Sequence, residues 1–259
     1  MNKLKCVDLR QQEQALVTEI GSELKAEAPT AHISHLPILF PPKSVDYVVV
    51  TLDPVYQSLE QATDQRFRHF MHDWEAFILH DCLKKQRRPY YITSLSKAVI
   101  AAPNEKKRRE KYYARWLPSF CSEVDALLAP EGVIVPLGSK TAKYLQQQAL
   151  PRPLTSALTH FSAQAAHWHQ RIPQEYPAEY ADFKAKFNLT QFLRSADHTL
   201  MTLFQVEKSI FETEIPYDLM RATLDALKSE QNAFTESHQE LFFTYLRQVE
   251  DINFSITKP

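Results

Sequence analysis

Short runs of apolar and β-branched residues alternate with longer amphipathic segments from the start of the chain to about residue 172. Four of these runs are too short for buried helices and predict strands, at residues 45–52, 88–95, 132–138 and 154–161. Apolar residues at helical spacing predict helices at residues 9–27, 60–86, 104–129, 139–149 and 162–172. Residues 29–44 contain four prolines and predict an extended loop.

Strands that alternate with helices predict a parallel sheet with helices on both faces. The expected fold class is α/β: a three-layer α/β/α domain, residues 1–172, around a central four-stranded, mainly parallel sheet. Residues 173–259 show three helical patterns without a convincing strand and predict a C-terminal helical extension. Ligands of such sheets bind beyond the carboxyl ends of the strands. The residues that follow each strand are therefore the first candidates for a site.

Composition and charge exclude several classes of site. Lys and Arg number 30 and Asp and Glu 31, so the net charge gives no indication of a nucleic-acid partner. The three glycines form neither a dinucleotide-binding nor a P-loop motif. The three cysteines are widely spaced, which argues against a zinc ribbon or a four-cysteine iron–sulfur cluster and favours reduced thiols. No signal peptide or membrane span is evident, so we expect a cytoplasmic protein without a membrane partner.

Three strand ends carry short polar motifs in a characteristic order. Residues 51–56 (Thr-Leu-Asp-Pro-Val-Tyr) follow the first strand, residues 91–97 (Tyr-Ile-Thr-Ser-Leu-Ser-Lys) end the second, and residues 160–164 (His-Phe-Ser-Ala-Gln) follow the fourth. They resemble the catalytic loops of the uracil-DNA glycosylase superfamily, whose usual forms are Gly-Gln-Asp-Pro-Tyr, Ile-Thr-Asn and His-Pro-Ser. Residues 134–138 resemble the third strand of that family. The resemblance covers residues 45–172 and implies the α/β/α fold described above.

The resemblance implies a DNA glycosylase that needs no metal and no organic cofactor. Cleavage of an N-glycosidic bond builds positive charge on the sugar and negative charge on the leaving base. Asp53 is implied as the carboxylate that activates water, and His160 as the donor to the departing base. Ser94, Tyr56 and Phe67 are implied contacts of a base that has left the helical stack. Phe67 also fits the core of a helix.

The sequence departs from the family pattern at the residues that select the base. Val55 separates Pro54 from Tyr56, and Ser94 stands where the family has asparagine. A hydroxyl reads a pyrimidine edge less selectively than an amide does. We therefore expect a larger or modified pyrimidine as substrate, for example a glucosylated phage cytosine in a role in antiviral defence.

Two basic runs, residues 84–88 and 106–111, stand out against the balanced average charge. The second run lies where the family's DNA-facing loop would be, although a solvated helix start explains it equally well. The expected DNA contacts are Lys97, Lys106, Lys107, Arg108, Arg109, Ser162 and Gln164. Trp168 is a further candidate for probing the DNA groove. His167 and His169 lack clear partner ligands, and no metal site is predicted.

Two other functions are compatible with these residues. One is a catalytically silent module of the same fold that binds nucleic acid or protein; Ser94 favours it, whereas Asp53 and His160 argue against it. The other is a hydrolase of a free nucleoside or small nucleotide. Salt-dependent DNA binding that weakens when residues 106–109 are neutralised would argue against that hydrolase.

Overall fold

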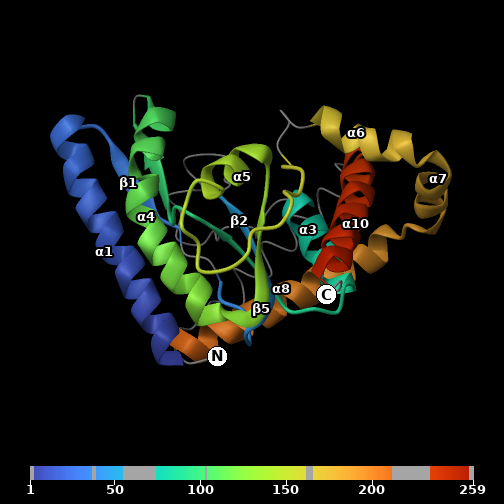
Figure 1. Ribbon diagram of the computed structural model, residues 1–259, viewed down its shortest axis with the longest axis horizontal. Helices are drawn as coiled ribbons and strands as arrows, with labels where there is room; N and C mark the ends of the chain where they lie inside the picture. Colours follow the sequence, from blue (N-terminus) through green and yellow to red (C-terminus); the bar gives the residue numbers. More distant parts are fainter. Residues whose placement is uncertain are drawn as a thin grey trace.

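The chain forms an α/β fold around a parallel sheet, as the alternation of strands and helices predicts (Figure 1). The computed structural model describes residues 3–36, 39–54, 74–102, 104–161, 166–211 and 234–256. Within these residues the sheet has three parallel strands in the order β3–β2–β5. They are β2 (Val45–Thr51), β3 (Tyr90–Ser94) and β5 (Leu128–Pro136). All three coincide with predicted strands, which confirms the α/β class.

The predicted fourth strand at residues 154–161 is present only as two isolated parallel bridges, Ile134 with Leu154 and Leu137 with Leu158. Pro136, between the two bridges, has no amide proton to donate. Its carbonyl oxygen accepts a hydrogen bond from Leu158 N at 2.9 Å, and the register shifts by one residue between the bridges. The missing donor and the shift interrupt the ladder, so the four-stranded sheet is reduced to three strands and a bridged segment.

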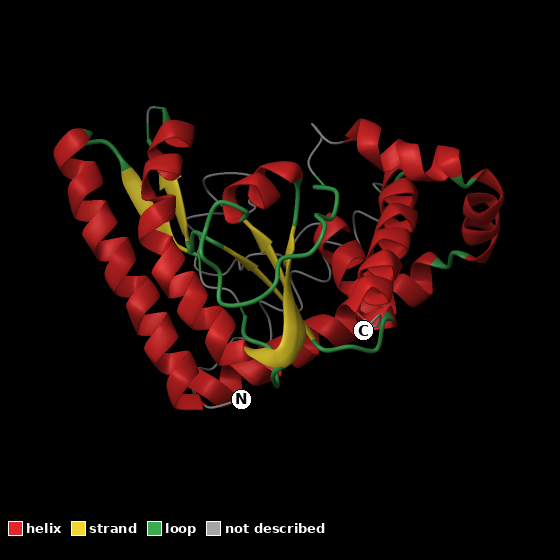
Figure 2. Ribbon diagram, viewed as in Figure 1, coloured by secondary structure: helices red, strands yellow, loops and turns green. Residues whose placement is uncertain are grey.

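Helices surround the strands on both sides (Figure 2). Those of the described residues are α1 (Lys3–Glu27), α3 (Trp74–Lys85), α4 (Glu105–Leu127), α5 (Ser139–Leu145), α6 (Ala166–Glu175), α7 (Pro177–Lys186), α8 (Leu189–Phe211) and α10 (Glu236–Ile256). Of the predicted helix at residues 60–86, residues 60–73 lie outside the described part of the chain. Within the described residues, no helix combines the length and apolar character that crossing a membrane requires.

Successive residues of β2 face opposite sides of the sheet. Tyr47 and Val49 belong to a hydrophobic cluster with α3, α8 and α10, whereas Val48 and Val50 belong to a second cluster with α1 and α4. Burial on both faces explains why the strand reads as a nearly continuous apolar run rather than an alternating one. The layers of helix, sheet and helix are visible in Figure 1.

The helices after residue 173 share the core of the sheet. Phe192 and Leu200 of α8 and Phe242 of α10 are buried in the same cluster as Val49. The predicted boundary at residue 172 therefore does not coincide with a break between two cores, because the C-terminal helices complete one face of the α/β unit.

A second, two-stranded sheet lies outside the predicted elements. Strand β1 (His32–His35) pairs antiparallel with β4 (Ala98–Ala101). The first strand falls in the segment predicted as an extended loop, where proline content hides a four-residue strand. This sheet connects the chain after α1 to the chain after β3.

Candidate functional site

A cavity of about 630 Å³ lies at the carboxyl ends of β2 and β5. Its lining includes both Asp53, which follows β2, and His160, which follows the bridged segment. These two residues are far apart in the sequence, and the parallel arrangement brings them to one edge of the sheet. Lys140 and Trp168 also line the cavity.

Backbone hydrogen bonds from both neighbouring strands hold the loop that carries Asp53. Leu95 N donates to Thr51 O at 2.7 Å from the β3 side, and Leu137 N donates to Val50 O at 2.8 Å from the β5 side. The Thr51 hydroxyl donates to the carbonyl oxygen of Asp53 at 2.8 Å and closes a turn after the strand. The carboxylate is thus presented by a loop that the sheet itself anchors.

The two carboxylate oxygens of Asp53 have different surroundings. The Tyr113 hydroxyl donates to Oδ2 at 2.6 Å, and Arg109 Nε lies 3.8 Å from the same oxygen. Oδ1 is buried and has no hydrogen-bond partner within the described part of the chain. Burial raises the pKa of Asp53 above its ordinary value, although Arg109 and Tyr113 act in the opposite direction. Oδ1 therefore keeps acceptor capacity that no described group uses.

Arg109 and Tyr113 both lie on the first turns of α4, four residues apart on one face of the helix. The sequence assigned Arg109 to a DNA contact, and it did not connect Tyr113 with Asp53. Their spacing of four residues indicates that they share one face of a helix. Only the fold shows that this face of α4 meets the end of β2.

The backbone around His160 is fixed by a close approach to β5. Gly138 has a φ of 91°, and a Cβ atom at that position would lie 3.0 Å from the Cβ of His160. Any larger residue would therefore be strained and would push His160 away. His169 Nε2 donates to the His160 carbonyl oxygen at 2.8 Å and adds an anchor from α6.

A further anchor comes from α10, which sequence reasoning did not connect with the site. Gln248 accepts a hydrogen bond from Thr159 N at 2.9 Å and donates to the Thr159 hydroxyl at 2.7 Å. Tyr245 donates to the Thr159 carbonyl oxygen at 3.0 Å. The residue before His160 is thus held at three of its polar atoms.

His160 is half-buried, and burial lowers the pKa of its imidazole, with His169 acting in the same direction. The ring is therefore neutral at neutral pH and carries one N–H donor. A neutral imidazole that donates a hydrogen bond is compatible with stabilising negative charge on a departing group.

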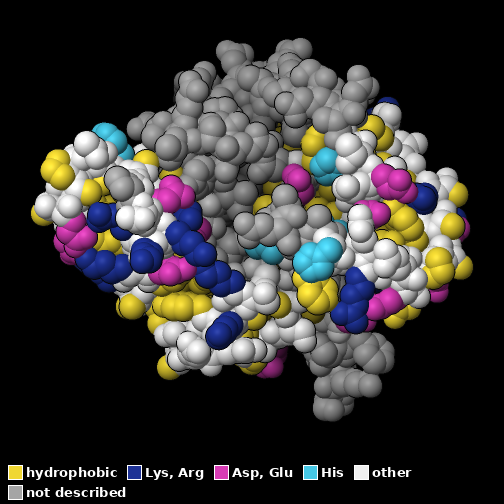
Figure 3. Space-filling view, turned by 90° about the horizontal axis from the view of Figure 1, so that it is seen from above, with side chains coloured by type: hydrophobic (Ala, Val, Ile, Leu, Met, Phe, Trp, Pro, Cys, Tyr) yellow, Lys and Arg dark blue, Asp and Glu magenta, His cyan; other side chains and the backbone are white. Residues whose placement is uncertain are grey.

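The rim of the cavity combines positive charge with an exposed aromatic ring. Trp168 has 47% of its surface exposed, and it is a large hydrophobic side chain at the mouth of the cavity. Lys140 is paired with Glu110 at 2.8 Å. In Figure 3, which looks down on this end of the molecule, Lys and Arg side chains gather on one side of the face and histidine side chains lie across from them.

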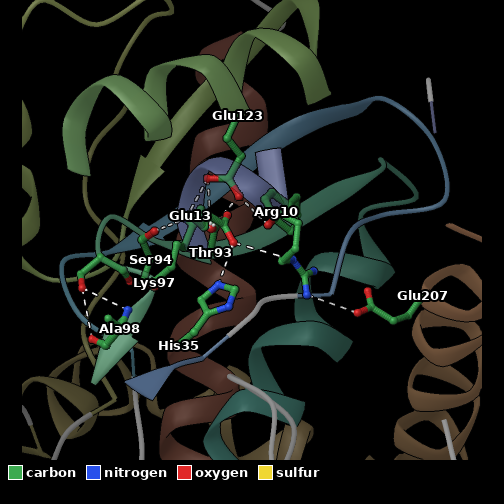
Figure 4. Close-up of polar contacts among 11 residues, drawn as sticks. Arg10, Glu13, His35, Thr93, Ser94, Lys97, Ala98, Glu123 and Glu207 are labelled. Atoms are coloured by element: carbon green, nitrogen blue, oxygen red, sulfur yellow. Dashed lines mark hydrogen bonds and ion pairs between the residues drawn. The ribbon is translucent and has the colours of Figure 1, made fainter. Parts of the chain in front are cut away.

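The structure corrects the predicted roles of Ser94 and Lys97. Both are fully buried, and neither lines the cavity. The Ser94 hydroxyl donates to the carbonyl oxygen of Ser96. Lys97 Nζ donates to Glu123 Oε2 at 2.7 Å and to Thr93 Oγ1 at 2.6 Å (Figure 4). Neither polar group is free to contact a base or a phosphate, because the interior already satisfies both.

The remaining predicted contacts fall into two groups. Lys106 and Lys107 are exposed at the start of α4, whereas Arg108 is paired with Glu27 at 3.1 Å and Arg109 with Asp53. The basic run is thus partly neutralised. Four further predicted contacts lie outside the described part of the chain: Tyr56, Phe67, Ser162 and Gln164.

Among the described residues, no group of three or more His, Cys, Asp or Glu side chains is placed to hold a metal ion. No protein-family model matches this chain, and no curated protein and no solved structure matches it either. The geometry of the cavity is therefore the basis for assigning a function.

Proposed function

We propose that the chain is a DNA glycosylase that hydrolyses the N-glycosidic bond of a modified pyrimidine and leaves an abasic site. The observation that carries this proposal is the shared cavity of Asp53 and His160. A carboxylate and an imidazole in one cavity supply the two groups that this hydrolysis needs, one beside the sugar and one beside the leaving base.

Asp53 is the proposed base. Its Oδ1 atom has no hydrogen-bond partner among the described residues and is the proposed acceptor of the proton from water, while Tyr113 and Arg109 orient the carboxylate through Oδ2. The ionised carboxylate also stabilises positive charge that develops on the sugar ring. The base must be ionised to act, so activity is expected to rise with pH through a pKa above that of an ordinary aspartate.

His160 is the proposed donor to the departing base. Its neutral ring donates an N–H to the oxygen on which negative charge develops, in a cavity large enough for a base with a substituent. Trp168 at the cavity mouth offers a surface for stacking, and Lys106 and Lys107 offer charges for phosphate.

Base release from a defined panel of DNAs tests the proposal. The full chain is incubated with DNA containing uracil, 5-hydroxymethylcytosine or glucosylated 5-hydroxymethylcytosine, and released bases are identified by mass spectrometry while alkali-labile sites are counted on gels. The expected result is one released modified pyrimidine, with an equal number of alkali-labile sites, and an Asp53→Asn variant that releases it at least about 10²-fold more slowly. Release at the wild-type rate by Asp53→Asn would exclude the mechanism.

A second candidate function is a non-catalytic nucleic-acid-binding module. The observation in its favour is Ser94, which replaces a base-reading asparagine in the resemblance and is buried away from the cavity. This candidate predicts DNA binding with no base release from any member of the panel, and binding that is insensitive to Asp53→Asn.

A further inference from the structure

A second cavity, of about 320 Å³, lies at the opposite end of the parallel sheet. It is formed where β2 and β3 begin, between α3, α8 and residues 39–43. Apolar side chains make up much of its wall, among them Leu39, Val45, Ile92 and Leu203. Its size is at the lower limit of typical small-molecule sites.

Positive charge surrounds this apolar interior. Among the described residues, the lining contains four cationic side chains and no carboxylate: Lys43, Lys84, Arg87 and Arg88. Within the described chain none of the four forms an ion pair, although the adjacent Lys85 is bound to Asp81 at 3.0 Å. Most other clustered cations of the structure are neutralised by nearby carboxylates, as Arg115 is by Glu19 at 2.8 Å. The described chain thus supplies no ion-pair partner for these four charges.

Arg87 occupies a backbone position that normally favours glycine. Its φ is 56°, in the left-handed region, directly after α3 ends, and its amide donates to Lys84 O at 3.0 Å. A residue with a Cβ is disfavoured in this conformation. The chain therefore places a cation at the cavity at the expense of backbone energy.

A buried polar group lies inside the cavity as well. His80 is 5% exposed and lines the wall, and its Nδ1 shares a hydrogen bond of 3.0 Å with the Tyr90 hydroxyl. Burial lowers the pKa of His80 to about 4, so the ring is neutral at neutral pH. Its Nε2 atom has no hydrogen bond within the described residues and is available to a ligand. The wall thus includes a neutral polar side chain that is separate from the cationic rim.

We propose that this cavity binds an amphipathic organic anion, with an apolar body of one or two rings or a short acyl chain inside and its acidic group between Lys84, Arg87 and Arg88. Burial of the ligand's apolar body against the wall stabilises the complex. The cations, which form no ion pair within the described chain, favour a ligand with an acidic group over a neutral one. This site lies at the other end of the sheet from Asp53 and His160, and it does not depend on the proposed glycosylase activity.

Two fluorescent probes that share an apolar body test the proposal. 1-Anilinonaphthalene-8-sulfonate carries the acidic group, and N-phenyl-1-naphthylamine lacks it. Each is titrated into the full chain, and the sulfonate is expected to bind at least about tenfold more tightly, which corresponds to one charge-assisted contact.

Variants locate the binding. Arg87→Gly removes the cation at a position where glycine relieves the backbone, so folding is not impaired. Combined with Arg88→Gln, it is expected to weaken the sulfonate at least about tenfold and to leave the neutral probe unchanged. Thr202→Trp fills the cavity and is expected to abolish the binding of both probes. The matched control is Lys25→Gln, an exposed cation on α1 without an ion pair in the described chain.

The proposal is overturned if Arg87→Gly with Arg88→Gln binds the sulfonate as tightly as the wild type does. It is also overturned if Lys25→Gln weakens the sulfonate equally, because the effect would then reflect general surface charge. Far-ultraviolet circular dichroism of each variant verifies that the fold is intact.

Discussion

The ends of β2 and β3 are adjacent in the sheet and both carry polar residues, yet these residues have opposite surroundings. After β2, Asp53 lines a cavity, and one of its carboxylate oxygens has no partner among the residues that the structure describes. After β3, Lys97 and Glu123 are each about 2% exposed and satisfy one another through a contact of 2.7 Å. Polar residues at a strand end can therefore be either a site or a buried support.

The polar network behind β3 is a larger feature than one ion pair. Glu123 also accepts hydrogen bonds from Tyr91 at 2.6 Å and Thr93 at 3.2 Å. Beside it, Glu13 of α1 is bound to His35 of β1 at 3.1 Å (Figure 4). The contacts of Glu123 join α4 to β3 and to Lys97, and the Glu13–His35 pair joins α1 to β1.

Removing Lys97 is expected to produce the largest effect on stability. Lys97→Met leaves Glu123 as an uncompensated buried charge, which costs about 3–5 kcal/mol. Urea denaturation of the full chain measures the loss. Lys97→Met combined with Glu123→Leu is expected to recover most of it, and Lys143→Met, at an exposed lysine, is the control. A loss below about 1 kcal/mol for Lys97→Met would show that the two strand ends do not differ as described.

Removing the Tyr113 hydroxyl is expected to change the pH dependence of base release. Tyr113→Phe takes away the donor that holds Asp53 ionised, so the pKa of Asp53 rises further and the acidic limb of the activity profile moves up by roughly one pH unit. The matched control is Tyr112→Phe, because the buried Tyr112 hydroxyl has no hydrogen-bond partner in the described chain. Identical profiles for the two variants would contradict the role of Tyr113.

Neutralising Lys106 and Lys107 is expected to lower the affinity for DNA and to make that affinity less dependent on salt concentration. Each phosphate contact contributes about one unit to the slope of log affinity against log salt, so Lys106→Gln with Lys107→Gln should lower that slope by about two. Fluorescence anisotropy with a labelled duplex at several salt concentrations measures it. An unchanged slope would remove the start of α4 from the DNA-binding surface; Lys25→Gln serves as the control.

The smallest expected effect is that of Asp53→Asn on stability. The pKa of Asp53 in the fold is above its unfolded value, so ionisation disfavours folding as pH rises from the unfolded to the folded pKa. Replacing the carboxylate removes this pH-dependent loss, and the net change at pH 7 is expected to stay within about 1 kcal/mol. Denaturation at pH 4 and pH 7 measures it. A loss as large as that of Lys97→Met would make Asp53 a structural residue.

The apolar pattern predicted the sheet, because buried β-branched runs such as residues 45–52 have few alternatives to an interior strand. It did not reveal that Pro136 interrupts the ladder to the fourth segment, since the register shift depends on tertiary pairing. Asp53 and His160 were predicted from a resemblance at strand ends, and the parallel topology brings them to one cavity. Ser94 and Lys97 were misassigned, because burial behind β3 depends on α4, which lies far along the chain.

The rate of base release in a single turnover tests the central claim most directly. The wild type, Asp53→Asn and His160→Ala are compared on phage DNA with glucosylated 5-hydroxymethylcytosine, with Asp125→Asn on the exposed side of α4 as control. We expect Asp53→Asn and His160→Ala each to release the base about 10²–10⁴-fold more slowly than the wild type, and the control to match the wild type. Wild-type rates in both Asp53→Asn and His160→Ala would contradict the claim that this cavity breaks the glycosidic bond.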